Sequence, residues 1–411
     1  MIAVNRAERL TLALSFAYFL LLLASYYLLR PVRDGLISGL GTDQVKFLSV
    51  VVLISMLAIT PLYGALMARF PRAKLLPAIY AFFVVNLLVF AVVFAVPQYS
   101  AWATRGFYVW VTIFNMFVVS VFWSVMADIW REEQGRRLFG VIAAGGSLGG
   151  LLGPSLAQVF AQRLGHSGLT VIAALLLCGA IVCLLLLGRI ARPDAIKKGP
   201  STQAFGGSSW QGIILVLRSP FLLGIAALVI IGSVVAMFAY IETGRLVKEL
   251  VATPEARTAF FARIDFWTNV VALILQAIVT GLLTKRFGIV APLVGLAVVS
   301  CVSFVALALS PLLFVLAITN VARRASEFGM GKPGRDMLYT VTTPEEKYLA
   351  KNVIDTVIYR SGDVLGSWLH TGLIAIGLTL VGISWLAAAA LIGAIFVALA
   401  VVRGYRTRGG R

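Results

Sequence analysis

Apolar runs of about 20 residues recur along the whole chain, and no other feature constrains its fold as strongly. The chain has 411 residues, of which 60% are hydrophobic and 13% are charged. A backbone surrounded by lipid must satisfy its own hydrogen bonds, and this requirement favours helices. We therefore predict an all-α integral membrane protein with twelve transmembrane helices. The expected spans cover residues 10–34, 46–68, 75–96, 106–129, 138–160, 168–188, 219–242, 264–286, 289–310, 311–338, 348–376 and 379–402.

The charged loops indicate how these spans lie in the membrane. The basic start, residues 1–9, precedes an apolar run that is too long for a cleaved secretory signal, so we interpret that run as the first span. Most of the 35 lysines and arginines fall in loops on one side of the alternating spans. Because short cytoplasmic loops carry the excess of positive charge, we predict an inner-membrane protein with both termini cytoplasmic. The net charge of +18 then reflects topology and indicates no nucleic-acid partner.

The sequence offers little for metal, cofactor or catalytic chemistry. The three cysteines, Cys178, Cys183 and Cys301, lie in apolar spans without a Cys-x-x-Cys or Cys/His spacing, as is typical of buried small side chains. No HExxH, Walker or GxSxG pattern appears. We expect neither a metal nor a cofactor, and an enzyme is the least favoured class.

The chain reads as two halves of six spans each. We expect an N-terminal half over residues 1–188, a cytoplasmic linker over 189–218 with a short helix near 210–217, and a C-terminal half over 219–411. The segments after spans 2 and 8 repeat one spacing, from Gly64 to Arg69-Phe70 and from Gly281 to Arg286-Phe287. Spans 3, 6, 9 and 12 contain no charged residue. A repeat of six-span halves with every third helix apolar is typical of the major facilitator fold.

Two motifs are similar to those of that superfamily. The loop after span 2 resembles the motif G-x-x-x-D-R-x-G-R in Gly64, Arg69 and Arg72, with Ala68 and Pro71 in place of the acid and the second glycine. Span 5 resembles an exchanger motif in Gly140, Gly149, Gly153 and Pro154. A second interpretation of that glycine stripe is close helix packing. The resemblance implies gating roles for Gly64, Arg69, Arg72, Gly149, Gly153, Pro154, Gly281 and Arg286.

Charged residues gather in the hairpin of spans 10 and 11. Span 10 continues from an apolar start into Arg323, Arg324, Glu327, Lys332, Arg335 and Asp336. On span 11, α-helical spacing predicts that one face carries Asn352, Asp355, Tyr359, Asp363 and His370. A charge in hydrocarbon costs at least ~2.5 kcal/mol, so these residues are expected to line a hydrated, functional cavity.

Four segments together resemble the ATP/ADP translocase (nucleotide transporter) family. They are Tyr27–Leu36 with Arg30, Arg33 and Asp34, Phe122–Asp128, Arg136–Gly140, and Lys351–Gly362 with Asp355 and Arg360. The resemblance implies that Arg30, Arg33, Asp34, Asp355 and Arg360 take part in nucleotide binding or transport. Arg33 stands where that family usually has lysine, and Asp363 stands where a lysine is expected.

The same residues allow two interpretations. Arg323, Arg324 and Arg360 are expected near the membrane midplane, where guanidinium groups suit phosphate or carboxylate, and Tyr359, Trp123 or Phe238 could stack a ring. Alternatively the charges pair internally, as Arg323–Glu327, Arg324–Glu327, Arg30–Asp34, and Arg360 with Asp363 or Asp355. A second polar stripe on span 8 comprises Asp265, Asn269, Gln276 and Thr280.

We therefore predict a secondary active transporter that moves a nucleotide or another anionic, phosphorylated metabolite by alternating access. Its expected partners are that small anion and the lipid bilayer, and we expect a monomer. The expected substrate-binding residues are Arg30, Arg33, Asp34, Arg323, Arg324, Glu327, Asn352, Asp355, Tyr359, Arg360 and Asp363. The alternatives are a proton-coupled antiporter of amphipathic compounds, in which buried acids carry the proton, and a non-transporting membrane module with fully paired charges.

Overall fold

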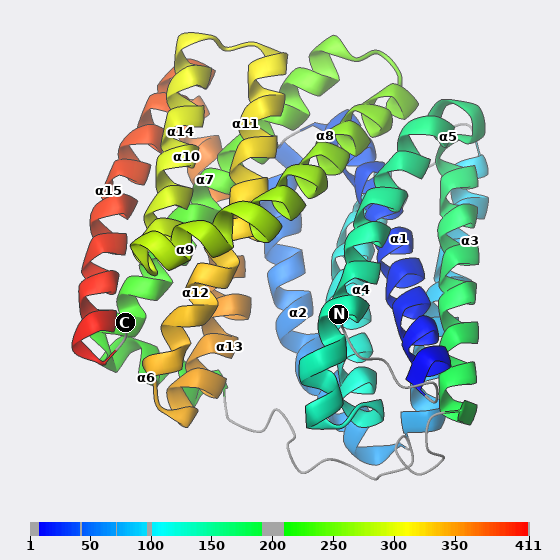
Figure 1. Cartoon of the computed structure of the whole chain (residues 1–411). Coiled ribbons are helices and arrows are strands. Elements are labelled where there is room, and N and C mark those ends of the chain that lie inside the picture. The colour runs from blue at the N-terminus through cyan, green and yellow to red at the C-terminus, as the bar shows by residue number, and fades with distance from the viewer. Residues whose placement is uncertain (1–7, 42, 71, 97–100, 191–208, 410–411) are drawn as a thin grey trace. The chain divides into compact units, whose positions relative to one another are not determined.

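The computed structural model describes residues 8–41, 43–70, 72–96, 101–190 and 209–409, and among these the chain is helical with no strand. The helices of the first part are α1 (Arg9–Leu40), α2 (Asp43–Arg69), α3 (Arg72–Ala95), α4 (Ala101–Ile129) and α5 (Glu132–Ile190). Those of the second part are α6 (Ser209–Arg218), α7 (Pro220–Leu250), α8 (Pro254–Ile274), α9 (Gly281–Phe287), α10 (Val290–Leu309), α11 (Leu313–Ser326), α12 (Lys332–Leu338), α13 (Lys351–Val353), α14 (Tyr359–Ala375) and α15 (Leu380–Thr407). Figure 1 shows their course along the chain.

The helices follow the expected spans closely. α5 covers two of them, because Gly165 adopts a left-handed φ of 62° that folds the helix into two arms. Among the described residues, eight helices are long and apolar enough to cross a membrane. The prediction of an all-α membrane fold is confirmed, whereas the number twelve stays a prediction. The short helix expected near 210–217 is α6, and the linker residues 191–208 lie outside the described part of the chain.

Contacts divide the chain into two compact units. The first comprises Met1–Leu40, Ile54–Phe205 and Val251–Phe266, and the second comprises Gly41–Leu53, Gly206–Leu250 and Trp267–Arg411. The start of α2 therefore belongs to the second unit and the start of α8 to the first. The division into halves at 188 and 219 stays a prediction.

The first unit is built on close contact between α1 and α5. A Cβ added at Gly149 would lie 2.4 Å from the carbonyl oxygen of Leu20, and one at Gly153 would lie 2.6 Å from that of Ala24. The backbones touch at these points because glycine presents no side chain. The structure therefore supports the packing interpretation of the glycine stripe.

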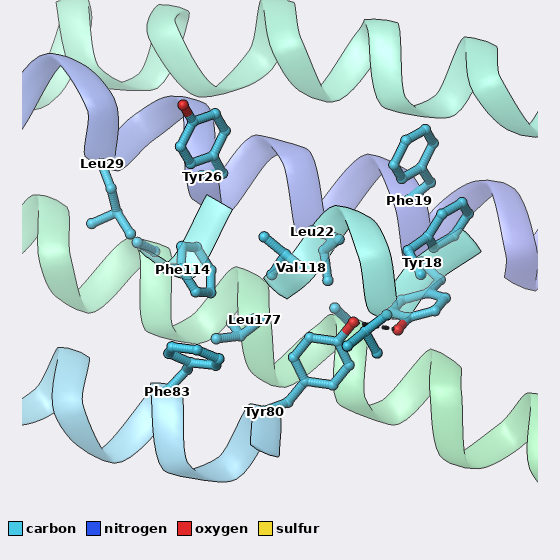
Figure 2. Packing of buried hydrophobic residues seen from close by; sticks show 14 of the residues in the cluster. Tyr18, Phe19, Leu22, Tyr26, Leu29, Tyr80, Phe83, Phe114, Val118 and Leu177 are labelled. Carbon is cyan, nitrogen blue, oxygen red and sulfur yellow. Dashed lines mark hydrogen bonds between the residues drawn. The ribbon is translucent and has the colours of Figure 1, made fainter. Parts of the chain in front are cut away.

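Aromatic side chains fill the interior of this unit (Figure 2). The hydroxyls of Tyr18 and Tyr80 share a hydrogen bond of 2.6 Å across the fully buried cluster. Phe19 stacks on Phe122 with ring centroids 4.0 Å apart. Trp123, considered above as a stacking partner for a ligand, packs edge-on against Phe19 within this cluster.

The second unit packs α7 against α14 and α15, and α10 against α15 and α11. Its buried apolar residues form two separate clusters, one around Leu222 and Ile354 and one around Phe304 and Leu391. Its helices are also less regular. π-Helical segments occur at Leu275–Thr280, Glu327–Gly331, Glu346–Ala350 and Ile354–Ile358. Such segments are rare and often mark functional sites.

Candidate functional site

The second unit contains a partly open cavity of about 70 Å³. Most of its wall is apolar and comes from α7, α10 and α15. The polar part of the wall consists of Arg323, Glu327, Arg335 and Tyr359, with the hydroxyls of Ser233 and Ser300. Two guanidinium groups and one carboxylate give this wall a formal charge of +1.

The π-helical segment Glu327–Gly331 explains how these charges meet. In an uninterrupted α-helix, residues eight apart are about 80° apart around the axis. A π-helical stretch has roughly 4.4 residues per turn and brings Glu327 and Arg335 to the same face. Their side chains pair across it, with Arg335 Nη2 2.7 Å from Glu327 Oε1. Gly329 permits this segment to pack directly on Ala272 and Leu275.

The ion pair differs from the one that helical spacing predicted. One of the two interpretations paired Glu327 with Arg323 or Arg324, whereas the structure pairs it with Arg335. The helix is regular between those arginines and Glu327, but the π-helical segment that follows brings Arg335 onto the carboxylate. Arg335 also keeps its buried Nε without a hydrogen bond among the described residues. That donor points to a place for an additional acceptor beside the cavity.

Tyr359 is the contribution of α14 to the cavity wall. The guanidinium of the next residue, Arg360, lies 5.6 Å from the centre of the Tyr359 ring and donates a 3.0 Å hydrogen bond to Asp363. The pairing of Arg360 with Asp363 is one of the two that the sequence allowed. Asp363 thus offsets part of the positive charge beside the cavity.

The five residues expected on one face of this helix lie in different surroundings. Asn352 and Asp355 are exposed, whereas His370 is buried against α7. Residues 354–358 are π-helical, so the phase of the helix changes before Tyr359. Substrate-binding roles for Asn352 and Asp355 stay predictions. Just before this helix, Lys351 on α13 pairs with Asp336 of α12 at 2.7 Å.

The three candidate residues of α1 lie in the first unit. Arg33 pairs with Asp34 at 2.8 Å, donates to the hydroxyl of Thr112 at 3.3 Å, and lies over the ring of Tyr108. Arg30 lies 3.7 Å from Asp265 of α8. The close ion pair of Asp34 is with the adjacent Arg33, and Arg30 lies beside the carboxylate that α8 supplies, while Asp34 still interacts electrostatically with Arg30.

The structure places the second polar stripe in different surroundings. Asp265 is buried in the first unit, whereas Gln276 is exposed within a π-helical segment of the second. The side chain of Thr280 lies outside what the structure describes.

The candidate gating residues have mixed surroundings. Gly149 and Gly153 lie against α1 as described above, and Pro154 follows within α5. Arg69 and Arg286 are exposed at the ends of α2 and α9, and a Cβ at Gly281 would meet nothing within 4 Å. The surroundings of Gly64 and the side chain of Arg72 lie outside the described residues. Gating roles for all of these residues stay predictions.

Sequence reasoning did not single out Glu242, although its side chain is only 1% exposed. It lies on α7, at the end of an expected span, and contacts both His370 and Arg245. The available signal was an acidic residue in an apolar run, with histidine on a second apolar run.

Solved structures resemble the whole fold. A POT family transporter in complex with a thioalcohol-conjugated peptide matches with a TM-score of 0.68 and 12% identity, over 96% of both chains. A bacterial homologue of the iron transporter ferroportin, in its inward-facing state, matches with a TM-score of 0.68 and 14% identity, over 97% of this chain and 99% of that one. The long apolar helices indicate a multi-pass membrane protein, and these structures show that it has the major facilitator fold.

The family follows from the sequence. Residues 94–408 match the family described as TLC ATP/ADP transporter, and the chain belongs to that family. It is a family of transporters, so the chain is not an enzyme. ADP,ATP carrier protein 1 of Chlamydia pneumoniae is 22% identical over 67% of this chain, which matches 61% of that protein's length. ADP,ATP carrier protein 2 of the same organism is 22% identical over 90% of this chain and 85% of its own length.

Proposed function

We propose that the chain is a secondary transporter that exchanges adenine nucleotides, with the cavity of the second unit as its phosphate-binding site. The observation that carries the proposal is the convergence of Arg323, Arg335 and Tyr359 on one small cavity. Guanidinium groups bind phosphate oxygens in a planar, bidentate geometry. The names of the two Chlamydia proteins, which are ADP,ATP carriers, support the choice of nucleotide.

The size of the cavity limits what it can hold. A volume of about 70 Å³ is small beside the pockets that hold whole drug-sized ligands, and it suits a phosphoryl group better than a nucleoside. We therefore assign the terminal phosphate to the cavity and the nucleoside to a place outside it. An incoming phosphate at Arg335 also meets the negative charge of Glu327, which opposes its binding.

The same proposal includes the setting of the molecule. We place it in the cytoplasmic (inner) membrane as a monomer with both termini cytoplasmic, because positively charged loops favour that side. Arg30, Arg33 and Asp34 of α1 are also proposed to take part in substrate binding. Arg33 contacts Thr112 and Arg30 lies beside Asp265, and charged side chains inside a membrane protein are usually functional.

The test uses the full chain reconstituted in liposomes. We expect saturable exchange of external ATP or ADP for internal nucleotide, and a rise in melting temperature of the purified protein with ATP or ADP. Arg335→Ala should weaken nucleotide affinity at least about tenfold, because one charge-assisted contact contributes about 1.5–3 kcal/mol. Arg403→Ala, which removes an exposed arginine at the end of α15, is the matched control. Absence of both exchange and thermal stabilisation with ATP, ADP and inorganic phosphate contradicts the proposal.

A further inference from the structure

A second buried polar cluster lies in the same unit, at the other end of α14. The carboxylate of Glu242 accepts from His370 Nε2 at 2.8 Å through Oε1. Its Oε2 accepts from Arg245 Nε at 2.9 Å and lies 2.7 Å from Arg245 Nη2. The side chains of Glu242 and His370 are 1% and 5% exposed. None of the three residues lines the cavity.

These contacts leave room for one more proton. Arg245 is always charged and neutralises Glu242, so the cluster is neutral when His370 is a neutral imidazole that donates through Nε2. His370 Nδ1 then makes no hydrogen bond within the described part of the chain and is free to accept a proton. The resulting imidazolium is held by Glu242 and lies beside the ring of Phe238, with ring centroids 6.0 Å apart. Both protonation states therefore have partners within the protein.

Other charged residues near the Glu242–His370 cluster make contacts with residues other than His370. On α7, Glu249 Oε1 lies 4.0 Å from Arg245 Nη1, and Lys248 is the residue before Glu249. From the start of α2, Lys46 lies over the ring of Trp368 and pairs with Asp43 at 3.6 Å. From α11, Asn320 donates to Thr243 and carries no charge. α10 has no charged residue, and those of α15 lie at its opposite end.

α14 links this cluster to the cavity. A Cβ at Gly362 would lie 2.6 Å from Ser233 Cβ, and one at Gly366 would lie 2.9 Å from Met237 Cβ. The helix is therefore in direct contact with α7 over the turns between the two polar sites. Tyr359 of the cavity and His370 of the cluster are eleven residues apart, which is about 16 Å along the helix. A change in the bond at one end thus acts on the packing of the helix that carries the other.

We propose that Glu242 and His370 form a proton-binding site, separate from the phosphate site, and that the transport cycle binds and releases one proton there. The proton goes to His370 Nδ1, and the bond to Glu242 becomes an ion pair. The coupling to nucleotide rests on the proposed function. The existence of the proton site does not.

The first experiment tests the site without any substrate. The chain contains two histidines, His166 and His370, so ¹⁵N-histidine labelling of the full chain in lipid nanodiscs gives two imidazole signals, which His370→Gln assigns. We expect the His370 signals to report a gained proton as the pH falls, and this response to differ in Glu242→Gln, which removes the carboxylate that holds the imidazolium. A His370 signal that does not titrate, or that titrates identically in Glu242→Gln, overturns the proposal.

The second experiment tests the coupling. Proteoliposomes with a trapped pH-sensitive dye are given external ATP, and internal pH and nucleotide uptake are followed together. We expect proton movement with uptake in the wild type, and at least a tenfold loss of that movement in Glu242→Gln and His370→Gln. Their nucleotide affinity should stay within about twofold of the wild type, and His166→Gln should behave as the wild type.

Each outcome of the second experiment has a distinct meaning. Nucleotide transport without proton movement in the wild type overturns the coupling, and so does full proton movement in both variants. If the wild type neither binds nor moves nucleotide, the proposed function fails, while the histidine titration still decides whether the proton site exists.

Discussion

The α1–α5 contact of the first unit and the α7–α14 contact of the second are both made by glycines, but they have different surroundings. Both depend on glycines that bring two backbones together, at Gly149 and Gly153 in the first and at Gly362 and Gly366 in the second. The first contact adjoins a continuous aromatic cluster. The second lies between a polar cavity and a buried Glu–His pair. The first unit therefore gains rigidity from its packing, whereas the second keeps its helices close and leaves space for ligands between them.

The largest expected effect tests the rigid side of this comparison. Gly153→Leu places a side chain where even a Cβ lies 2.6 Å from Ala24 O and 2.7 Å from Leu28 N, so α1 and α5 must separate. We expect a loss of several kcal/mol, on the order of 4 or more, and little folded protein by thermal denaturation or detergent size-exclusion. Gly140→Ala, whose Cβ meets nothing within 4 Å, should leave the melting temperature unchanged. Equal stability of the two variants would mean that the close contact is not structural.

The next effect separates stability from binding in the second unit. Glu327→Ala leaves Arg335 without its carboxylate, and both side chains are only partly exposed. We expect a loss of about 1–3 kcal/mol in unfolding free energy, as for a buried charge that loses its partner. Addition of ATP should raise the melting temperature of Glu327→Ala by more than that of the wild type, because the carboxylate of Glu327 no longer opposes phosphate at Arg335. A thermal-shift titration measures both quantities, and a smaller ATP response in the variant contradicts the opposing effect of Glu327 on phosphate.

A smaller effect is expected at Asp363. This carboxylate accepts a 3.0 Å hydrogen bond from Arg360, next to the cavity residue Tyr359. Asp363→Asn removes one negative charge and releases Arg360, so we expect affinity for ATP to rise about threefold to tenfold. Isothermal titration measures the change, and Asp43→Asn, at an exposed carboxylate of α2, provides the control. Unchanged or weaker binding would show that Arg360 does not act on the substrate.

The smallest effect concerns pH and the first unit. His166 lies in the turn between the two arms of α5, outside the expected spans, and its Nε2 bonds Thr258 Oγ1 at 3.0 Å. Burial lowers the pKa of His166 below its ordinary value of about 6.5. The unfolded chain then binds the proton more readily, so this residue's contribution to stability is full above about pH 6.5 and declines as pH falls. We expect the melting temperature of wild type to fall more between pH 7 and 5 than that of His166→Gln. Parallel curves would contradict this.

The sequence predicts the class of fold well, because the length of apolar spans and the charge of the loops are set by the membrane and do not depend on how individual side chains pack. It also points to the correct part of the chain, since Arg323, Glu327 and Tyr359 do meet at one cavity. The pairing of charges could not be predicted. Arg335 reaches Glu327 because the helix is π-helical between them, and the residue types of this segment do not predict a π-helix.

Contacts between distant helices were equally beyond the sequence. Arg30 lies beside Asp265, and His370 bonds Glu242, although the members of each pair are far apart in the chain. Helical periodicity relates residues within one helix and says nothing about which neighbour a face meets. His370 accordingly meets Glu242 of α7, which periodicity within its own helix could not indicate.

Gly366 has a consequence for genetics. It touches neither the cavity nor the Glu242–His370 pair, yet its space is taken up by Met237 and Val234 of α7. Substitutions there damage both sites together and resemble the loss of either one in a growth selection. Revertants of Gly366→Ala are then expected at positions of α7 and α14 that let the two backbones separate, because the nearest atoms are Met237 Cβ and Val234 Cα, which a smaller side chain would keep. Such compensating pairs, read from a selection, map the contact between the two helices independently of any structure.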